Sequence, residues 1–239
     1  MVYFVFWRCI SDVLHCKYRA FFMTSKFFCT LFCIFVLQQT PLTMTTHEKP
    51  IERHPLEPFL PTGAKLLMLG SFPPPHERWS MEFFYPNWIN DMWRIVGHIF
   101  FGNRHHFEVA GAKKFDQQRV IDFCTKRGIA IYDTAREVRR LQDNASDKFL
   151  EVVTPTDLRA LLAEIPECHA IVTTGQKATD VIINTFGCAE PAVGSYSEFT
   201  IDGRPMRLWR MPSSSRAYPL KLEKKAEFYH KMFREEGVL

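Results

Sequence analysis

Four short, mainly apolar runs punctuate the chain, and loop-forming residues follow each of them. Their length and continuity are typical of strands that are buried on both faces of a parallel sheet. Between and after them, apolar residues recur at three- and four-residue spacings, which predicts helices. The strand-like runs are residues 65–71, 129–133, 170–174 and 206–211, and the helical stretches are residues 88–101, 113–127, 155–165, 176–186 and 219–236.

Strands that alternate with helices place the parallel strands side by side and leave the helices to cover both faces of the sheet. The sequence therefore predicts an α/β fold, a three-layer αβα sandwich with a central, mainly parallel, four-stranded sheet. Residues 195–210 are an exception, because a turn around Asp202 and Gly203 separates two strand-like runs. This pattern predicts a terminal antiparallel hairpin.

The chain divides into three parts by composition. Residues 1–43 form an apolar, basic leader, residues 44–63 form an extended arm punctuated by prolines, and residues 64–239 form the folded domain. The apolar run 27–37 and the basic residues before it outline a secretory signal, but the run is too short to span a bilayer. Met44 begins a segment that fits the start of a cytoplasmic protein. We favour a mis-assigned start and a cytoplasmic protein, and a signal or anchor remains the alternative.

Charge and cysteine content narrow the class of protein. The 239 residues carry a formal charge of +4, of which the leader contributes +3, so +1 remains for residues 44–239. Any surface that binds nucleic acid must therefore be a local patch. Only Cys124, Cys168 and Cys188 belong to the body, and they form no C-x-x-C pair. We expect buried free thiols in a reduced compartment, no metal, no cofactor, no stable association of the body with membranes, and a monomer.

The first strand leads into a long loop that is rich in proline and aromatic residues, residues 70–93. Phe84 and Tyr85 precede the predicted helix and could stack against an extruded base, whereas Trp88 and Trp93 have the helical spacing of core residues. Asn90 falls in the first turn of that helix. Its amide could cap the backbone or hold a water molecule against a sugar carbon, and the sequence leaves both roles open.

Two other loops follow strands and could bind phosphate. The segment MPSSSRAYP, residues 211–219, offers hydroxyl groups and backbone amides before the last helix, although such a run also forms unliganded turns. The segment TTGQKATD, residues 173–180, opens a helix whose N-terminus favours an anion. In open α/β sheets the ligand site lies at the carboxyl ends of the strands, which is where these loops belong.

The order LGSFP, FFYPNWINDMW, IAIYDTAREVRR, TTGQKA and MPSSSRAYP resembles the uracil-DNA glycosylase superfamily, nearest its hypoxanthine-DNA glycosylase branch. The resemblance covers residues 65–236. It implies a monofunctional DNA glycosylase that hydrolyses the N-glycosidic bond of uracil or hypoxanthine in DNA during base excision repair. By this resemblance Asn90 is the catalytic residue, the base pocket consists of Gly70, Ser71, Phe72, Pro73, Phe84, Tyr85, Asp133 and Thr134, and DNA is bound by Gly175, Gln176, Lys177, Ser213, Ser214, Ser215, Arg216 and Tyr218.

Three positions depart from that branch. Asp91 and Met92 stand where it usually has arginine and phenylalanine, and Arg216 stands where it has proline. These departures leave open a catalytically weak or inactive nucleic-acid-binding protein of the same fold. The small charge of the body also leaves open a hydrolase of small nucleotides or nucleosides.

Overall fold

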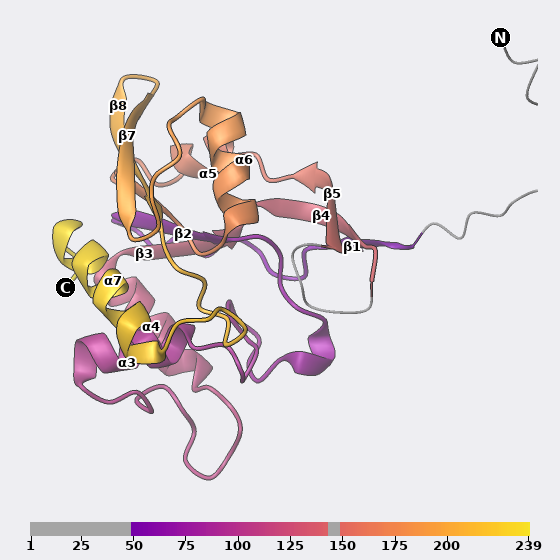
Figure 1. The fold of residues 1–239 in the computed structure, drawn as a ribbon, viewed down its shortest axis with the longest axis vertical. Coiled ribbons are helices and arrows are strands. Elements are labelled where there is room, and N and C mark those ends of the chain that lie inside the picture. The colour runs from indigo at the N-terminus through magenta and orange to yellow at the C-terminus, as the bar shows by residue number, and fades with distance from the viewer. Residues whose placement is uncertain (1–48, 143–148) are drawn as a thin grey trace, which may run out of the picture. The chain divides into compact units, whose positions relative to one another are not determined.

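The computed structural model describes residues 49–142 and 149–239. Its centre is a sheet with the strand order β3-β2-β6-β8-β7 (Figure 1). The first four of these strands are parallel, and β7 pairs with β8 in the antiparallel sense. Their bounds are β2 Leu66–Gly70, β3 Ile129–Asp133, β6 Ala170–Thr173, β7 Ser195–Ile201 and β8 Arg204–Arg210.

The four predicted strands and the hairpin are confirmed, but the prediction of a four-stranded sheet is wrong. The sheet has five strands because the first arm of the hairpin, β7, pairs with β8 from Ser195–Arg210 to Ile201–Arg204. The hairpin is therefore a part of the central sheet. Asp202 at its tip has a positive φ of 50° and Gly203 follows with 83°, a backbone conformation in which glycine is unstrained.

The helices form the outer layers. In Figure 1, α3, α4 and α7 gather on one face of the sheet and α5 and α6 lie on the other. Several helices begin later than the sequence predicted, because Asp116 and Asp157 cap α4 and α5 and the preceding residues are loop or strand. The bounds are α3 Met92–Phe101, α4 Gln117–Arg127, α5 Leu158–Ala163, α6 Gln176–Phe186 and α7 Leu222–Glu235.

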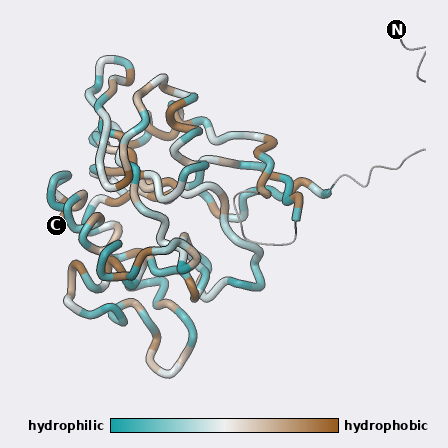
Figure 2. Tube along the Cα trace, viewed as in Figure 1, coloured by the Kyte–Doolittle hydropathy of each residue, from teal (hydrophilic) through white to brown (hydrophobic). Residues whose placement is uncertain are grey.

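The hydrophobic core lies between the sheet and its helices. Leu66, Leu67 and Leu69 of β2 are completely buried, as expected for a central strand with helices on both sides. Figure 2 shows the corresponding hydrophobic stretches along the central strands and α3. Trp93 is also buried, with 2% of its surface exposed, which confirms its prediction as a core residue. The three body cysteines are buried free thiols.

A second, three-stranded sheet with the order β1-β4-β5 was not predicted. Its strands are β1 Ile51–Arg53, β4 Ala135–Arg140 and β5 Leu150–Pro155. Most side chains of β1 and β4 are charged, so the sequence contains no clear apolar pattern for these two strands. They are defined by their backbone pairing alone. Residues 51–53, in the segment expected to be an extended arm, thus form an edge strand.

The leader, residues 1–43, lies outside the described residues, as do residues 44–48 of the arm. Among residues 49–142 and 149–239, none of the helices has the length and apolar character needed to cross a membrane.

Candidate functional site

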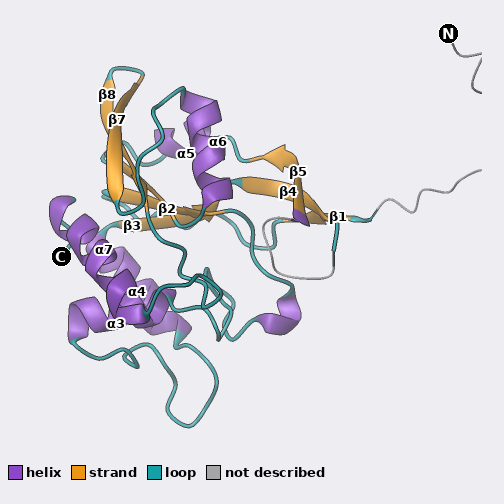
Figure 3. Cartoon of the chain, viewed as in Figure 1, coloured by secondary structure: helices purple, strands orange, loops and turns teal. Residues whose placement is uncertain are grey.

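A cavity of about 620 Å³ opens at the carboxyl ends of the parallel strands. The loops after β2 and β8 lie side by side there (Figure 3), and Asn90 forms an isolated antiparallel bridge with Ser215. Segments that are more than a hundred residues apart in the chain therefore meet at one rim of the sheet. The residues that line this cavity are Gly70, Ser71, Phe72, Pro73, Pro74, Arg78, Phe84, Tyr85, Pro86, Asn87, Ile89, Asn90, Asp133, Thr174, Gly175, Ser213, Ser214, Ser215, Arg216, Ala217, Tyr218 and Pro219.

The floor of the cavity is formed where β2 and β3 end together. Gly70 and Asp133 are partners in the parallel register, and the amide of Thr134 donates to the carbonyl of Gly70 over 2.9 Å. The Asp133 carboxylate folds over Gly70 so closely that a Cβ at Gly70 would lie 2.3 Å from Oδ1. A residue without a side chain is therefore required beneath this carboxylate.

We expect Gly70→Ala to displace the Asp133 carboxylate, because 2.3 Å is far inside van der Waals contact. The variant should lose about 1 to 3 kcal/mol of unfolding free energy, as overpacked sites do, measured by urea denaturation. Gly203→Ala shows the effect of backbone strain alone, because its φ is 83° and nothing lies within 4 Å of its Cβ position, whereas Gly70 has no positive φ and should lose stability through crowding alone. An unchanged stability of Gly70→Ala would contradict the crowding argument.

His54 holds the Asp133 carboxylate from behind. Its Nε2 lies 2.9 Å from Asp133 Oδ2, and its side chain is 2% exposed. The imidazole packs against the rings of Phe72, Phe84 and Tyr132, with ring centroids 5.3, 6.2 and 4.7 Å away. His54 comes from the segment just after β1, so the second sheet brings a residue to the site that no sequence motif indicated.

Tyr85 forms part of the aromatic wall in a backbone conformation that is rare for its type. Its φ is +52°, in the left-handed region, and such strain usually persists where the surroundings hold the residue in place. The phenol lies 3.2 Å from the hydroxyl of Thr174 at the end of β6, and the ring packs edge-on against Trp93. Burial raises the pKa of the Tyr85 phenol, so this group stays neutral.

Asn90 lies just before α3, two residues earlier than the helix begins, and not in its first turn as predicted. Its Oδ1 accepts a hydrogen bond from the amide of Met92 over 2.9 Å. Asp91 is the N-cap residue of α3 and has no side-chain capping bond, so this contact is a turn that Asn90 makes with the first amide of the helix. It also fixes which side of the amide is oxygen, because a backbone N–H can only donate. An amide oxygen has two lone pairs, so this bond leaves Oδ1 one acceptor position and leaves Nδ2 free of partners among the described residues. Bonding to the backbone and positioning of a water molecule are therefore compatible at Asn90.

Arg94 fixes the backbone of Asn90 from inside α3. Its Nη1 donates to the carbonyls of Trp88 and Asn90 over 2.8 and 3.0 Å, and its Nε lies 2.6 Å from a carboxylate oxygen of Glu108. The guanidinium stacks over the Trp88 ring at 4.4 Å. Burial lowers the pKa of Arg94, and the Glu108 carboxylate opposes that effect. Trp88, which the sequence predicted to be a core residue, is only half-buried, and the Arg94 guanidinium lies over its ring.

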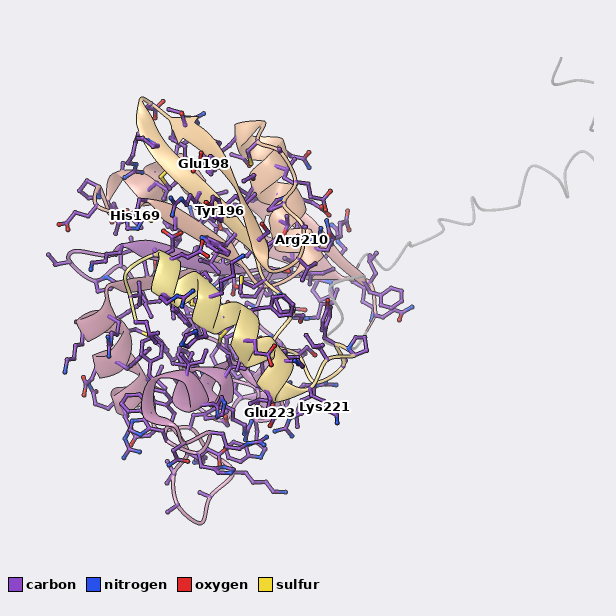
Figure 4. The ribbon with its side chains drawn as sticks, turned by 60° about the vertical axis from the view of Figure 1, so that its left-hand side comes forward. His169, Tyr196, Glu198, Arg210, Lys221 and Glu223 are labelled. Atoms are coloured by element: carbon purple, nitrogen blue, oxygen red, sulfur yellow. The ribbon has the colours of Figure 1, made fainter. Side chains whose placement is uncertain are left out.

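The serine loop, residues 211–220, connects Arg210 at the end of β8 with Lys221 at the start of α7 (Figure 4). The amide of Asp91 donates to the carbonyl of Ser214 over 2.9 Å, which holds the loop against the start of α3. The hydroxyls of Ser213 and Ser215 accept from amides of the loop itself. The loop is therefore internally organised before any ligand binds.

Two of the residues that depart from the hypoxanthine-DNA glycosylase pattern contact each other. Arg216 Nε lies 2.8 Å from Asp91 Oδ1, and Lys225 Nζ lies 3.7 Å from Asp91 Oδ2 while it donates to the carbonyl of Ser215 over 2.7 Å. Lys225 is completely buried, and burial lowers its pKa, whereas the Asp91 carboxylate raises it. Asp91 and Arg216 thus form one charged network that joins α3, the serine loop and α7.

Most of the predicted site residues line the cavity, and three do not. Thr134 is 1% exposed and lies behind the floor. The amide of Gln176 contacts Asp180 and Glu190, and Lys177 Nζ contacts the carbonyl of Leu150. Gln176 and Lys177 do not line the cavity, because their side chains point to α6 itself, to the loop that follows it and to β5.

Residues that the sequence analysis missed include His54, Arg94, Thr174 and Lys225. Thr174 lies at the end of a predicted strand and could have been chosen on that ground. Arg94 lies about one helical turn after Asn90, but no motif marked it. His54 and Lys225 reach the site only through long-range packing. Among residues 49–142 and 149–239, no group of three or more His, Cys, Asp and Glu side chains could hold a metal ion.

Comparison with solved structures finds a similar fold. The chain is similar to a protein from Methanosarcina acetivorans whose solution NMR structure is described as a "putative Uracil DNA glycosylase", with a TM-score of 0.54 and 20% sequence identity. The match covers 79% of this chain and 99% of that one. No protein-family model and no curated protein matches the chain. At this identity the likeness shows the fold alone: the chain has an α/β fold of the uracil-DNA glycosylase type.

Proposed function

We propose that the protein is a monofunctional DNA glycosylase that hydrolyses the N-glycosidic bond of a deaminated base, uracil or hypoxanthine, in DNA. The observation that carries this proposal is the position of the Asn90 amide. Its oxygen is held by the amide of Met92 at the rim of the cavity, directly beside the serine loop, and the aromatic side chains of Phe84 and Tyr85 line the same cavity. The cavity has room for one base, and the likeness in fold supports the same assignment.

The proposed reaction begins with a nucleotide turned out of the duplex, its base held against the Phe84 and Tyr85 wall. As the glycosidic bond breaks, the base leaves with the bonding electrons and the sugar becomes an oxocarbenium ion. Water held by Asn90 Oδ1 adds to the sugar carbon and releases a proton, so the products are the free base and an abasic site. A neutral amide is sufficient, because it only has to orient the water molecule.

The serine loop is proposed to grip the DNA backbone beside the extruded nucleotide. Arg216 belongs to this loop, and 45% of its side chain is exposed although it pairs with Asp91. The exposed part of the guanidinium can therefore contact a phosphate without leaving Asp91. In this proposal the contact between Asp91 and Arg216 replaces the arginine and proline of the hypoxanthine branch, so these departures are compatible with activity.

Excision assays on oligonucleotides that contain uracil, hypoxanthine or xanthine test the function. We expect release of at least one of these bases and an abasic site that is cut by mild alkali. Binding to such DNA without release would support the non-catalytic alternative. Release from free nucleosides, with none from DNA, would support the nucleoside hydrolase. Either result would overturn the proposed function.

A further inference from the structure

The three consecutive prolines of the first loop have no part in the mechanism above. Pro73 and Pro74 line the cavity, together with Phe72 before them. Proline has no backbone N–H, so this segment cannot donate hydrogen bonds to a neighbouring strand, and its carbonyl groups have to anchor it. The place of this triproline wall, residues 72–75, therefore depends on the donors that reach those carbonyls.

Two of the three proline carbonyls are bound by residues that follow closely in the chain. The Trp79 indole donates to the carbonyl of Pro74 over 2.8 Å. The amide of Arg78 donates to the carbonyl of Pro75 over 3.0 Å. Both bonds lie within one turn of the chain, so they fix the shape of the triproline wall but not its place against the sheets.

The third carbonyl, that of Pro73, is bound by Arg140, which lies 67 residues away at the end of β4. Arg140 Nη2 donates to this carbonyl over 2.6 Å. Its Nε donates to the Glu52 carboxylate of β1 over 3.0 Å, and the guanidinium lies 5.6 Å from the centre of the Phe72 ring. Val138, two residues earlier on the same face of β4, belongs to the small apolar cluster against which Phe72 packs. Arg140 therefore ties the triproline wall to two strands of the second sheet.

The guanidinium of Arg140 is suited to hold one arrangement of these groups. Its side chain is 10% exposed, and a buried charge has to be paired. Because the guanidinium is planar and its N–H groups form a rigid fork, bonds to Glu52 and Pro73 at the same time leave little freedom of movement. The triproline wall cannot shift against the second sheet without breaking one of these bonds.

We propose that Arg140 is a positioning residue, which holds the triproline wall so that the extruded nucleotide is aligned with the water molecule at Asn90. This inference rests on the proposed function, and it gives the second sheet a part in the reaction. Arg140 is not among the residues that line the cavity, so it acts through the carbonyl of Pro73. A misplacement of about 1 Å at a wall that positions a substrate lowers a rate by about 100-fold.

Arg140→Met tests this inference, because it keeps an unbranched stem beside Phe72 and removes both hydrogen bonds. At saturating DNA, the single-turnover rate of base excision should fall by about 100-fold. Affinity for undamaged duplex DNA should stay within about threefold, because the proposed phosphate contacts come from the serine loop. Arg140→Lys keeps the charge and one donor group but not the fork, so its rate should lie between those of Arg140→Met and the unaltered protein.

Arg204→Met is the matched control for the loss of an arginine that binds backbone carbonyls. Arg204 begins β8, at the end of the strand away from the cavity, and donates to the carbonyls of Leu162, Ile165 and Pro166 over 3.0 to 3.2 Å. Urea denaturation should show a loss of stability in both variants, whereas Arg204→Met should keep its excision rate. Equal excision rates for Arg140→Met and Arg204→Met would overturn the positioning role.

A double substitution separates alignment from a merely structural role. If Arg140 aligns the nucleotide with the water molecule at Asn90, its loss matters little once Asn90 is gone, so Arg140→Met should lower the residual rate of Asn90→Ala by less than about threefold. The same fold-loss in both backgrounds would overturn the inference and leave the proposed function standing. If the unaltered protein excises no base, the proposed function fails, and this inference fails with it.

Discussion

Asn90→Ala should lower single-turnover base excision by about 100- to 10,000-fold, the range that is typical for loss of a group that directs proton transfer or water attack. The cavity has other polar residues, but only Asn90 combines a fixed amide oxygen with a place at the junction of the first loop and the serine loop. DNA binding should be nearly unchanged, because the proposed contacts with phosphates come from the serine loop. Quenched-flow excision and fluorescence anisotropy measure the two quantities separately.

The same substitution removes the hydrogen bond that Asn90 Oδ1 accepts from the amide of Met92, so a loss of stability has to be separated from a loss of chemistry. Removal of one such hydrogen bond costs about 1 kcal/mol. Asp157→Ala is the matched control, because Asp157 accepts from the amide of Ala160 over 3.0 Å at the start of α5, on the other face of the sheet. It should lose the same unfolding free energy and keep full excision. An Asn90→Ala protein with undiminished single-turnover excision would remove Asn90 from the mechanism.

Asp91→Ala should destabilise the protein by about 3 kcal/mol, because removal of one partner of a buried ion pair leaves the other uncompensated. The uncompensated group is Lys225, which is completely buried. Its remaining polar contact among the described residues is the carbonyl of Ser215. The half-exposed Arg216 contributes little to this free energy, since solvent screens it. Urea denaturation gives the change directly.

Lys224 and Glu227 provide the control for a charged pair on the same helix. They are 2.8 Å apart, and both side chains are 62% exposed, so Glu227→Ala should change stability by less than about 0.5 kcal/mol. The double substitution Asp91→Ala with Lys225→Met removes the buried charge together with its partner, and it should recover much of the loss. A loss below about 1 kcal/mol in Asp91→Ala would show that this network does not hold the two loops together.

Asp91→Ala should also reduce excision, because the Asp91 carboxylate holds Arg216 of the serine loop in place directly beside Asn90. In the double variant we expect stability to return further than activity. That difference would indicate that the network aligns the two loops in addition to stabilising them.

The sequence by itself determined the parallel strands and the rim at which the site lies. The strands β2, β3 and β6 are buried on both faces, so each is a nearly continuous apolar run, whereas β8 buries Met206, Leu208 and Trp209 between partly exposed arginines. The carboxyl ends of these parallel strands must share one edge. That rule, together with the resemblance, predicted that Asn90, the first loop and the serine loop lie at the site. Local patterns of this kind need no knowledge of distant residues.

Only the tertiary structure decided how these residues are held. The pairing of β1 with β4 gives no hydrophobic signal because its side chains are charged, yet it positions His54 behind Asp133. Asp91 and Arg216 are 125 residues apart, and in the sequence they are two separate departures from the family pattern. Only the fold shows that they contact each other. Contacts between distant polar residues depend on geometry that only the packed core fixes, and one sequence contains no periodicity that reports them.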